Sequence, residues 1–351
     1  MRADGRLRMV VATPVDEELC AWMERAEPRL DLVRDHDLLA VMRHPGDHSG
    51  DPGWRRSALQ QERFDRLVDS AQALYGIPDV SPPALARTVR ANPDLRWVQT
   101  MAAGGAAQVA EAGLVAHELS RLTITTSAGV HAGPLAEFAL LGLLAGAKDV
   151  PRLLADARTR TWPGRWTMRH LSEQTVLVVG LGSLGREIVR LLSQLGARVI
   201  VANRTARPVE GVHRTFTLDE LASAARQADA LVVCLPGAAG TSRLVDAAVL
   251  GNLRPGATVV NVGRGMVVDE PALIEALSSG QVGFAALDVA AVEPLPVESP
   301  LWGLPNVLLS PHTAALSTLE DRRIAELAVE NATRLLDGLP LRNVLRASDL
   351  A

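Results

Sequence analysis

The sequence predicts an α/β protein with two domains, each built around a parallel sheet. The chain has 351 residues, which is long enough for two hydrophobic cores. Strand-like and helix-like patterns alternate over the first hundred residues, as expected of a small parallel α/β domain. A second alternation starts at Thr175 and continues to Leu309, which predicts a larger, doubly wound sheet of about seven strands.

The second domain is organised around a strand, a glycine-rich turn and a helix. Thr175–Val179 reads as a strand buried on both faces, and Arg198–Ala202 as the strand that follows the helix. The glycines between them have the G-x-G-x-x-G spacing, which lets a pyrophosphate approach the helix N-terminus. An ordinary glycine-rich αβ turn is the alternative. The predicted dinucleotide-binding residues of this turn are Gly180, Gly182, Ser183, Leu184 and Gly185.

The end of the next strand favours NADP over NAD as the cofactor. A free ribose 2′-hydroxyl usually meets Asp or Glu about twenty residues after the turn, whereas a 2′-phosphate requires a cation. The residues here are Asn203, Arg204 and Thr205, and no carboxylate precedes Glu210. The alternative is that Arg204 stacks on adenine or faces solvent.

Composition excludes several classes of protein. The formal net charge of −4 gives no basic surface for nucleic acid or an anionic membrane. The two cysteines, Cys20 and Cys234, have no metal-like or redox spacing, and no leader is recognised at the start, so a cytoplasmic protein is expected. The loop 44–54 (HPGDHSGDPGW) contains two histidines and two aspartates, but their spacing matches no metal site, so no metal is predicted.

The first domain is predicted to contain five strands, with three helices between them. The strands are Met9–Thr13, Leu30–Arg34, Ala73–Gly76, Arg96–Thr100 and Leu122–Thr126, and the helices are Glu17–Ala26, Glu62–Ser70 and Pro82–Ala91. The small residues of Met101–Gln108 follow a parallel strand, where backbone N–H groups are exposed to ligands, so we expect a substrate-binding loop. A flexible turn is the alternative.

The segment between the domains predicts an interface. Pro134–Ala147 is an apolar helix that carries only Glu137 and is too short to cross a bilayer. Such a helix must bury most of its circumference against another domain or subunit. His131 is expected to have a structural or capping role, and the arginine- and tryptophan-rich stretch Arg152–Arg169 to form a helix and a loop that cover the cleft or a partner subunit.

The remaining elements of the second domain follow the same alternation. The predicted strands are Ala230–Leu235, Thr258–Val262, Gly283–Val289 and Val307–Leu309, and the helices are Leu218–Ala225, Asp246–Asn252, Glu270–Ser278 and the long amphipathic Leu319–Asp337.

Three of the later strands are followed by loops with an isolated charged residue. These residues are Arg264, Glu293 and His312. The carboxyl ends of parallel strands face one crevice, so we expect the three side chains to converge there. A guanidinium can fix the carboxylate and carbonyl of a 2-oxo acid, an imidazole can exchange the hydroxyl proton, and a carboxylate stabilises the protonated imidazole. This set fits hydride transfer to or from a 2-hydroxy acid.

The chain resembles the D-isomer-specific 2-hydroxyacid dehydrogenase family from about Leu95 to Val344. The similar segments are LRWVQT, HAGPLAEFAL, GLGSLG, CLPGAAGTSRLVD, LRPGATVVNVGRGMVVDEPALIEAL, LDVAAVEPLPVESPLWGLPNV and SPH. The resemblance implies two Rossmann-like domains: a coenzyme domain with a doubly wound parallel sheet at 128–315, and a smaller flavodoxin-like substrate domain at 1–127 and 316–351. It also implies that the final helix returns to the first domain and that dimers form through the segment from Pro134.

The resemblance assigns roles residue by residue. Arg264 would bind the substrate, Glu293 would be the acid partner, and His312 the general acid and base. Ala103 and Gly104 would offer backbone N–H groups to the substrate carboxylate. The residues on the coenzyme side would be Leu235, Pro236, Val262, Arg264 and Asp288, with Asp288 on the nicotinamide carboxamide.

Some residues depart from the family pattern and leave the substrate open. An aromatic residue is usual at Ala290, a glycine often follows the histidine where this chain has HTAAL, and the substrate loop reads AAGGAA. The leading hypothesis is reduction of a small 2-oxo acid such as glyoxylate or hydroxypyruvate by NAD(P)H. Phosphoglycerate dehydrogenase ranks lower because no regulatory domain follows Leu345. The alternative from another class is a nicotinamide-sensing corepressor-like protein without turnover.

Overall fold

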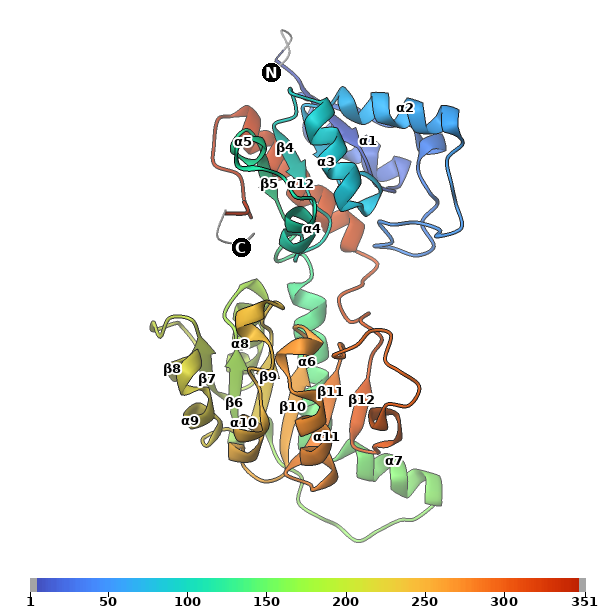
Figure 1. Cartoon of the computed structure of the whole chain (residues 1–351). Coiled ribbons are helices and arrows are strands. Elements are labelled where there is room, and N and C mark those ends of the chain that lie inside the picture. Colours follow the sequence, from blue (N-terminus) through green and yellow to red (C-terminus); the bar gives the residue numbers. More distant parts are fainter. Residues whose placement is uncertain (1–4, 347–351) are drawn as a thin grey trace. The chain divides into compact units, whose positions relative to one another are not determined.

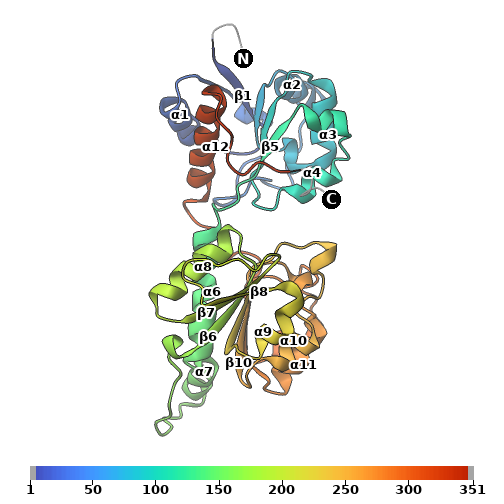
Figure 2. The same ribbon diagram turned by 90° about the vertical axis from the view of Figure 1, so that its left-hand side faces the viewer.

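The computed structural model describes residues 5–346, which form two compact units (Figures 1 and 2). The first unit comprises Met1–His131 and Leu316–Ala351, and the second Ala132–Ala315. The chain therefore crosses between the units twice, after His131 and before Leu316. The roles of substrate and coenzyme domain stay predictions.

The first unit contains a five-stranded parallel sheet in the order β2-β1-β3-β4-β5. This is the flavodoxin-like order, with its switch point between β1 and β3. Helices α1 and α12 cover one face of the sheet, and α2 and α3 the other (Figure 2). The strands are β1 (Leu7–Val11), β2 (Leu30–Val33), β3 (Ala73–Tyr75), β4 (Trp97–Gln99) and β5 (Thr123–Thr125). The helices are α1 (Glu17–Ala26), α2 (Ala58–Asp69), α3 (Pro82–Ala91), α4 (Ala106–Glu111), α5 (Ala116–Ser120) and α12 (Glu320–Leu336).

Helix α12 completes the core of the first unit although it lies more than 180 residues after β5 in the sequence. Ile324, Ala325, Ala328 and Ala332 are fully buried and recur at helical spacing on one face. These residues pack into the same core as Met9 and the other inner residues of the sheet. The return of the last helix, which the resemblance implies, is therefore observed.

The second unit contains a seven-stranded parallel sheet in the order β12-β11-β10-β9-β6-β7-β8. This order is that of a doubly wound dinucleotide-binding sheet extended by one strand, with its switch point between β6 and β9. The strands are β6 (Thr175–Val179), β7 (Arg198–Asn203), β8 (Arg214–Thr217), β9 (Ala230–Val233), β10 (Ala257–Asn261), β11 (Val282–Leu287) and β12 (Val307–Leu309). The helices are α6 (Ala132–Ala147), α7 (Val150–Thr159), α8 (Ser183–Gln194), α9 (Leu221–Ala225), α10 (Ala247–Asn252) and α11 (Glu270–Ser278).

The structure differs from the local predictions at strand β8, at helix α5, which was not predicted, and at the loop Met101–Gln108. Strand β8 is an edge strand in which Phe216 is the buried residue, so it has no apolar run that marks it in the sequence. The expected loop Met101–Gln108 is a turn only as far as Gly105, because helix α4 starts at Ala106. Alanine has the highest helix propensity, which explains why this small-residue stretch becomes helical.

Helix α6 approaches the sheet of the second unit closely. A Cβ at Gly142 would lie 2.6 Å from the Ala286 side chain, and one at Gly146 would lie 2.1 Å from Thr258 Oγ1. The glycines therefore let α6 pack directly on β10 and β11. Leu141, on the other face of α6, is exposed. Trp162, which follows α7, is 98% exposed. Among the described residues, no helix combines the length and apolar character that membrane crossing requires.

Candidate active site

The glycine turn after β6 has the backbone geometry that the motif predicts. Gly180 has φ of +102°, a left-handed value that favours glycine. Gly182 caps helix α8, and a Cβ on it would meet no atom within 4 Å, which leaves open space at the helix N-terminus. A Cβ on Gly185 would lie 2.1 Å from the Gly180 carbonyl oxygen. The turn fits a pyrophosphate at a free helix N-terminus.

The neighbouring strand end packs beneath this turn. The Leu235 side chain lies against Gly180, at 2.9 Å from the position of an added Cβ, and Pro236 after it is exposed. The Cys234 thiol donates to the carbonyl oxygens of Val179 and Gly180, each at 3.1 Å. Burial raises the pKa of this thiol to about 12, so Cys234 is a neutral packing residue.

The residues after β7 form an exposed polar turn. Arg204 and Thr205 are exposed, and Asn203 is half-buried. Among the described residues, no hydrogen bond or ion pair engages the Arg204 guanidinium. This cation is therefore free to meet a ligand.

Glu293 and His312 form a direct pair after β11 and β12. His312 Nδ1 lies 2.7 Å from Glu293 Oε2, and the Ala290 N–H donates to Glu293 Oε1 at 3.1 Å. The His312 side chain is 43% exposed and the Glu293 side chain 38% exposed. The carboxylate thus fixes the imidazole while the other ring nitrogen stays available.

The buried Asp288 carboxylate organises the loop that carries His312. Asp288 Oδ1 accepts from Ser310 Oγ at 2.6 Å, from the Thr313 N–H at 3.0 Å and from the Ala314 N–H at 2.9 Å. The His312 N–H donates to the Asp288 carbonyl oxygen at 2.8 Å. Sequence reasoning assigned Asp288 to the nicotinamide carboxamide and did not foresee this loop-holding role. Ser310 of the SPH motif, which donates to Asp288, was the residue in the sequence that could have indicated this role.

The structure places Arg264 at the same edge of the sheet but not in contact with the pair. Arg264 is exposed, and its Nη1 donates to the Gly263 carbonyl oxygen at 2.8 Å. A Cβ on Gly265 would lie 1.8 Å from the Ala290 carbonyl oxygen, so this segment packs against the loop that holds Glu293. Buried Val262 precedes it. No described contact joins the guanidinium to Glu293 or His312.

Glu270 at the start of α11 supports the same loop from below. Its Oε2 accepts from the Ala291 N–H at 2.9 Å, next to the Ala290 N–H that holds Glu293. Sequence reasoning missed this residue, because nothing in its helix pattern indicates a contact with a loop twenty residues away.

A largely apolar cavity of about 630 Å³ lies beside the pair in the second unit. This volume is within the range of small-molecule sites, roughly 300–1,000 Å³. Its walls come from the loops after β11 and β12 and from Trp302: Leu287, Asp288, Val289, Ala290, Glu293, Pro294, Leu295, Trp302, Leu309, Ser310, Pro311 and His312.

The predicted substrate loop lies in the first unit at the carboxyl end of β4. Ala103 and Gly104 are exposed, and neither backbone N–H has a partner among the described residues. Both N–H groups are therefore available to an anion.

Comparisons with known proteins agree with this geometry. Residues 140–314 match the family model for "D-isomer specific 2-hydroxyacid dehydrogenase, NAD binding domain". The structure of a D-isomer specific 2-hydroxyacid dehydrogenase from Xanthobacter autotrophicus is 30% identical, covers 99% of this chain and 100% of its own, and superposes with a TM-score of 0.78. The chain belongs to this family. Its two-domain Rossmann-like fold is thereby confirmed.

Curated members of the family show a similar level of identity. An (S)-sulfolactate dehydrogenase from Chromohalobacter salexigens is 31% identical over 223 residues, which are 62% of this chain and 71% of that protein. A glyoxylate/hydroxypyruvate reductase B from Pectobacterium atrosepticum is 31% identical over 209 residues, which are 58% and 65% respectively. The chain spans 52% of the length of a relative with 37% identity and 38% of the length of relatives with 35% identity.

The packing of the glycine turn predicts a loss of dinucleotide binding in Gly185→Ala. The new methyl group cannot fit 2.1 Å from the Gly180 carbonyl oxygen, so helix and turn must separate. We expect the dissociation constant for NAD(P)H, measured by fluorescence titration, to rise at least about tenfold. Gly251→Ala is the matched control. Gly251 lies in helix α10, and a Cβ added there would meet no atom within 4 Å. Equal binding by both variants would contradict the assigned turn.

Proposed function

We propose that the protein reduces a small 2-oxo acid to the D-2-hydroxy acid with NAD(P)H. The observation that supports this most is the pair of Glu293 and His312, 2.7 Å apart, on the sheet that also carries the glycine turn. An acid-base pair beside a dinucleotide turn fits oxidoreductase chemistry, and the family is one of dehydrogenases.

In this proposal His312 transfers the proton. Glu293 accepts the hydrogen bond from Nδ1–H, which orients the ring, and the protonated imidazole donates its Nε2 proton to the carbonyl oxygen and becomes neutral. A reduced nicotinamide cofactor, held at the turn of Gly180, Gly182 and Gly185, would supply the hydride. Arg264 would hold the substrate carboxylate by a charged fork. The free N–H groups of Ala103 and Gly104, in the first unit, are further proposed donors to a substrate carboxylate.

The proposed substrate is a small acid of the glyoxylate or hydroxypyruvate type. A relative of comparable identity is named glyoxylate/hydroxypyruvate reductase B, and another acts on sulfolactate by its name. The pair of Glu293 and His312 is present whichever acid is used, so it supports the reaction more than the identity of the acid.

The proposed cofactor is NADP. The free Arg204 at the end of β7 supports it, because a 2′-phosphate needs a cation there. The similar structure from Xanthobacter autotrophicus is in complex with NADPH. We also infer a homodimer, since α6 and the segment after α7 expose Leu141 and Trp162.

Replacement of His312 by asparagine tests the reaction. Asparagine tolerates the left-handed backbone at this position, where φ is +55°, so the loop should keep its shape. We expect wild-type protein to oxidise NADPH with glyoxylate or hydroxypyruvate, and His312→Asn to lose at least about a hundredfold in kcat with unchanged NADPH affinity. Wild-type protein that binds NADPH but reduces no acid of a 2-oxo acid panel would favour the corepressor alternative.

The contact between the carboxylate and the imidazole predicts a loss of turnover in Glu293→Gln. The neutral amide forms a weaker hydrogen bond with Nδ1 than the charged carboxylate does, so the imidazole is held less firmly for proton transfer. We expect kcat for reduction to fall at least about tenfold with unchanged NADPH affinity. Glu298→Gln serves as a control on the same exposed segment. Equal kcat values in wild type and Glu293→Gln would exclude the pairing.

Arg204→Ala tests the cofactor preference. Removal of the cation should weaken NADPH binding about tenfold or more and leave NADH binding nearly unchanged, because only NADPH carries the 2′-phosphate. The measurement is KM for each cofactor, with Arg226→Ala, an exposed arginine on the same unit, as control. Tighter wild-type binding of NADH than NADPH would reverse the assignment.

A further inference from the structure

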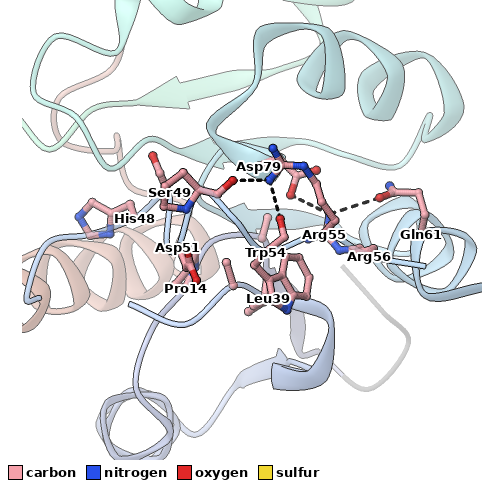
Figure 3. Close-up of a pocket in the computed structure, with 13 residues that line it drawn as sticks. Pro14, Leu39, His48, Ser49, Asp51, Trp54, Arg55, Arg56, Gln61 and Asp79 are labelled. Carbon is pink, nitrogen blue, oxygen red and sulfur yellow. Dashed lines mark hydrogen bonds and ion pairs between the residues drawn. The ribbon is translucent and has the colours of Figure 1, made fainter. Parts of the chain in front are cut away.

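A second cavity, of about 360 Å³, lies entirely in the first unit and is lined by none of the predicted site residues (Figure 3). Its floor is formed by Ala12 and Pro14 after β1, and Asp79 after β3 contributes to its wall. These strands flank the switch point of the five-stranded sheet, where ligands of such sheets bind. The rest of the lining comes from the segment 39–61.

The loop that encloses the cavity has a defined shape. Asp47 is buried and accepts from the Arg43 backbone N–H, Nε and Nη2 at 2.7–3.0 Å. The side-chain hydrogen bond from Arg43 holds the pKa of Asp47 at about 2. Gly50, at φ +67°, packs so closely on Ala40 that a Cβ would lie 2.4 Å from its methyl group. The cavity is therefore preformed.

One pair of charges in the lining is already neutralised. Arg56 Nη1 donates to Asp79 Oδ1 at 2.8 Å, and its Nε donates to the Leu38 carbonyl oxygen at 2.7 Å. The same guanidinium stacks 3.6 Å from the centre of the Phe64 ring. These contacts make Arg56 and Asp79 a wall of the cavity.

Two further charges of opposite sign face the cavity without an ionic partner. Arg55 Nη1 donates only to the carbonyl oxygens of Pro52 and Trp54, at 2.5 and 2.7 Å. Asp51 Oδ1 accepts only from the Gly53 N–H at 2.8 Å. In the described chain neither side chain forms a salt bridge. Figure 3 shows both on the cavity, with Pro14, Leu39 and the Trp54 ring beside them.

We propose that this cavity binds a small amino acid in its zwitterionic form. Its carboxylate would pair with Arg55, its ammonium group with Asp51, and a short apolar side chain would contact Leu39 and Trp54. A simple anion would be repelled by Asp51, and a simple cation by Arg55. A zwitterion satisfies both charges.

His48 connects the cavity to the residue that precedes the first crossing of the chain. His48 lines the cavity, and its Nε2 lies 3.6 Å from Glu320 Oε1. His131 Nε2 is hydrogen-bonded to the same oxygen at 2.9 Å, and His131 is the residue after which the chain first leaves the first unit. A ligand that moves His48 therefore changes the environment of a residue at the chain crossing.

Calorimetric titration of the full chain tests the proposal with glycine, alanine and valine as probes. We expect at least one to bind, and its deaminated and decarboxylated analogues (for valine, 3-methylbutanoate and isobutylamine) to bind at least about tenfold more weakly. Arg55→Ala and Asp51→Asn should each weaken binding about tenfold or more. Asparagine keeps the oxygen that accepts from Gly53, so the loop is preserved.

Exposed residues of the same charge in the first unit provide the controls. Arg66→Ala and Asp94→Asn lie outside the cavity and should bind the probe like wild type. Thermal unfolding without ligand should be the same in all four variants. Failure of all three amino acids to bind, equal binding of an analogue that lacks one charge, or full binding by both cavity variants would each overturn the proposal.

Discussion

The left-handed backbone at His312 is the constraint on which the geometry of the active site depends. A non-glycine residue in this region costs roughly 1–3 kcal/mol, so other contacts must hold it there. Asp288 supplies them, because its carbonyl oxygen binds the His312 N–H and its Oδ1 binds the residues on both sides. The imidazole then points Nδ1 at Glu293. A buried carboxylate with three donors on one oxygen is thus the support for the proposed proton donor.

Sequence alone predicts the parts of the fold whose signal is local. Helices α1, α3 and α11 have the predicted bounds, and the glycine turn follows from residues within six positions. Strand β8 and helix α4 were missed because one has a single buried residue and the other consists of small residues. Local patterns identify an element only when its apolar residues form a continuous run or recur with a period.

The candidate site divides in the same way. The meeting of Glu293 and His312 follows from the rule that parallel strands end at one edge, together with the family resemblance. The supporting contacts of Asp288 and Glu270 depend on which backbone N–H groups point inward. Nothing in composition or spacing encodes that direction. Arg264 shows the limit most clearly, since its segment lies where expected while its guanidinium bonds to its own neighbour.

Glu320, in the first turn of α12, connects the loop 44–54 to His131, the residue before the first crossing of the chain. Burial raises the pKa of Glu320, but the imidazoles of His131 and His48 outweigh burial and hold the pKa at about 2, below its ordinary 4.5. Its position in the first turn of α12 favours the same ionised form. The contribution of ionised Glu320 to the stability of the folded first unit is therefore complete above about pH 4.5 and is lost as the pH falls toward 2. This carboxylate is 4% exposed, lies 3.6 Å from His48 of the loop and is hydrogen-bonded to His131, where the chain leaves the first unit. One ionised group therefore links loop, helix and the residue before the first crossing.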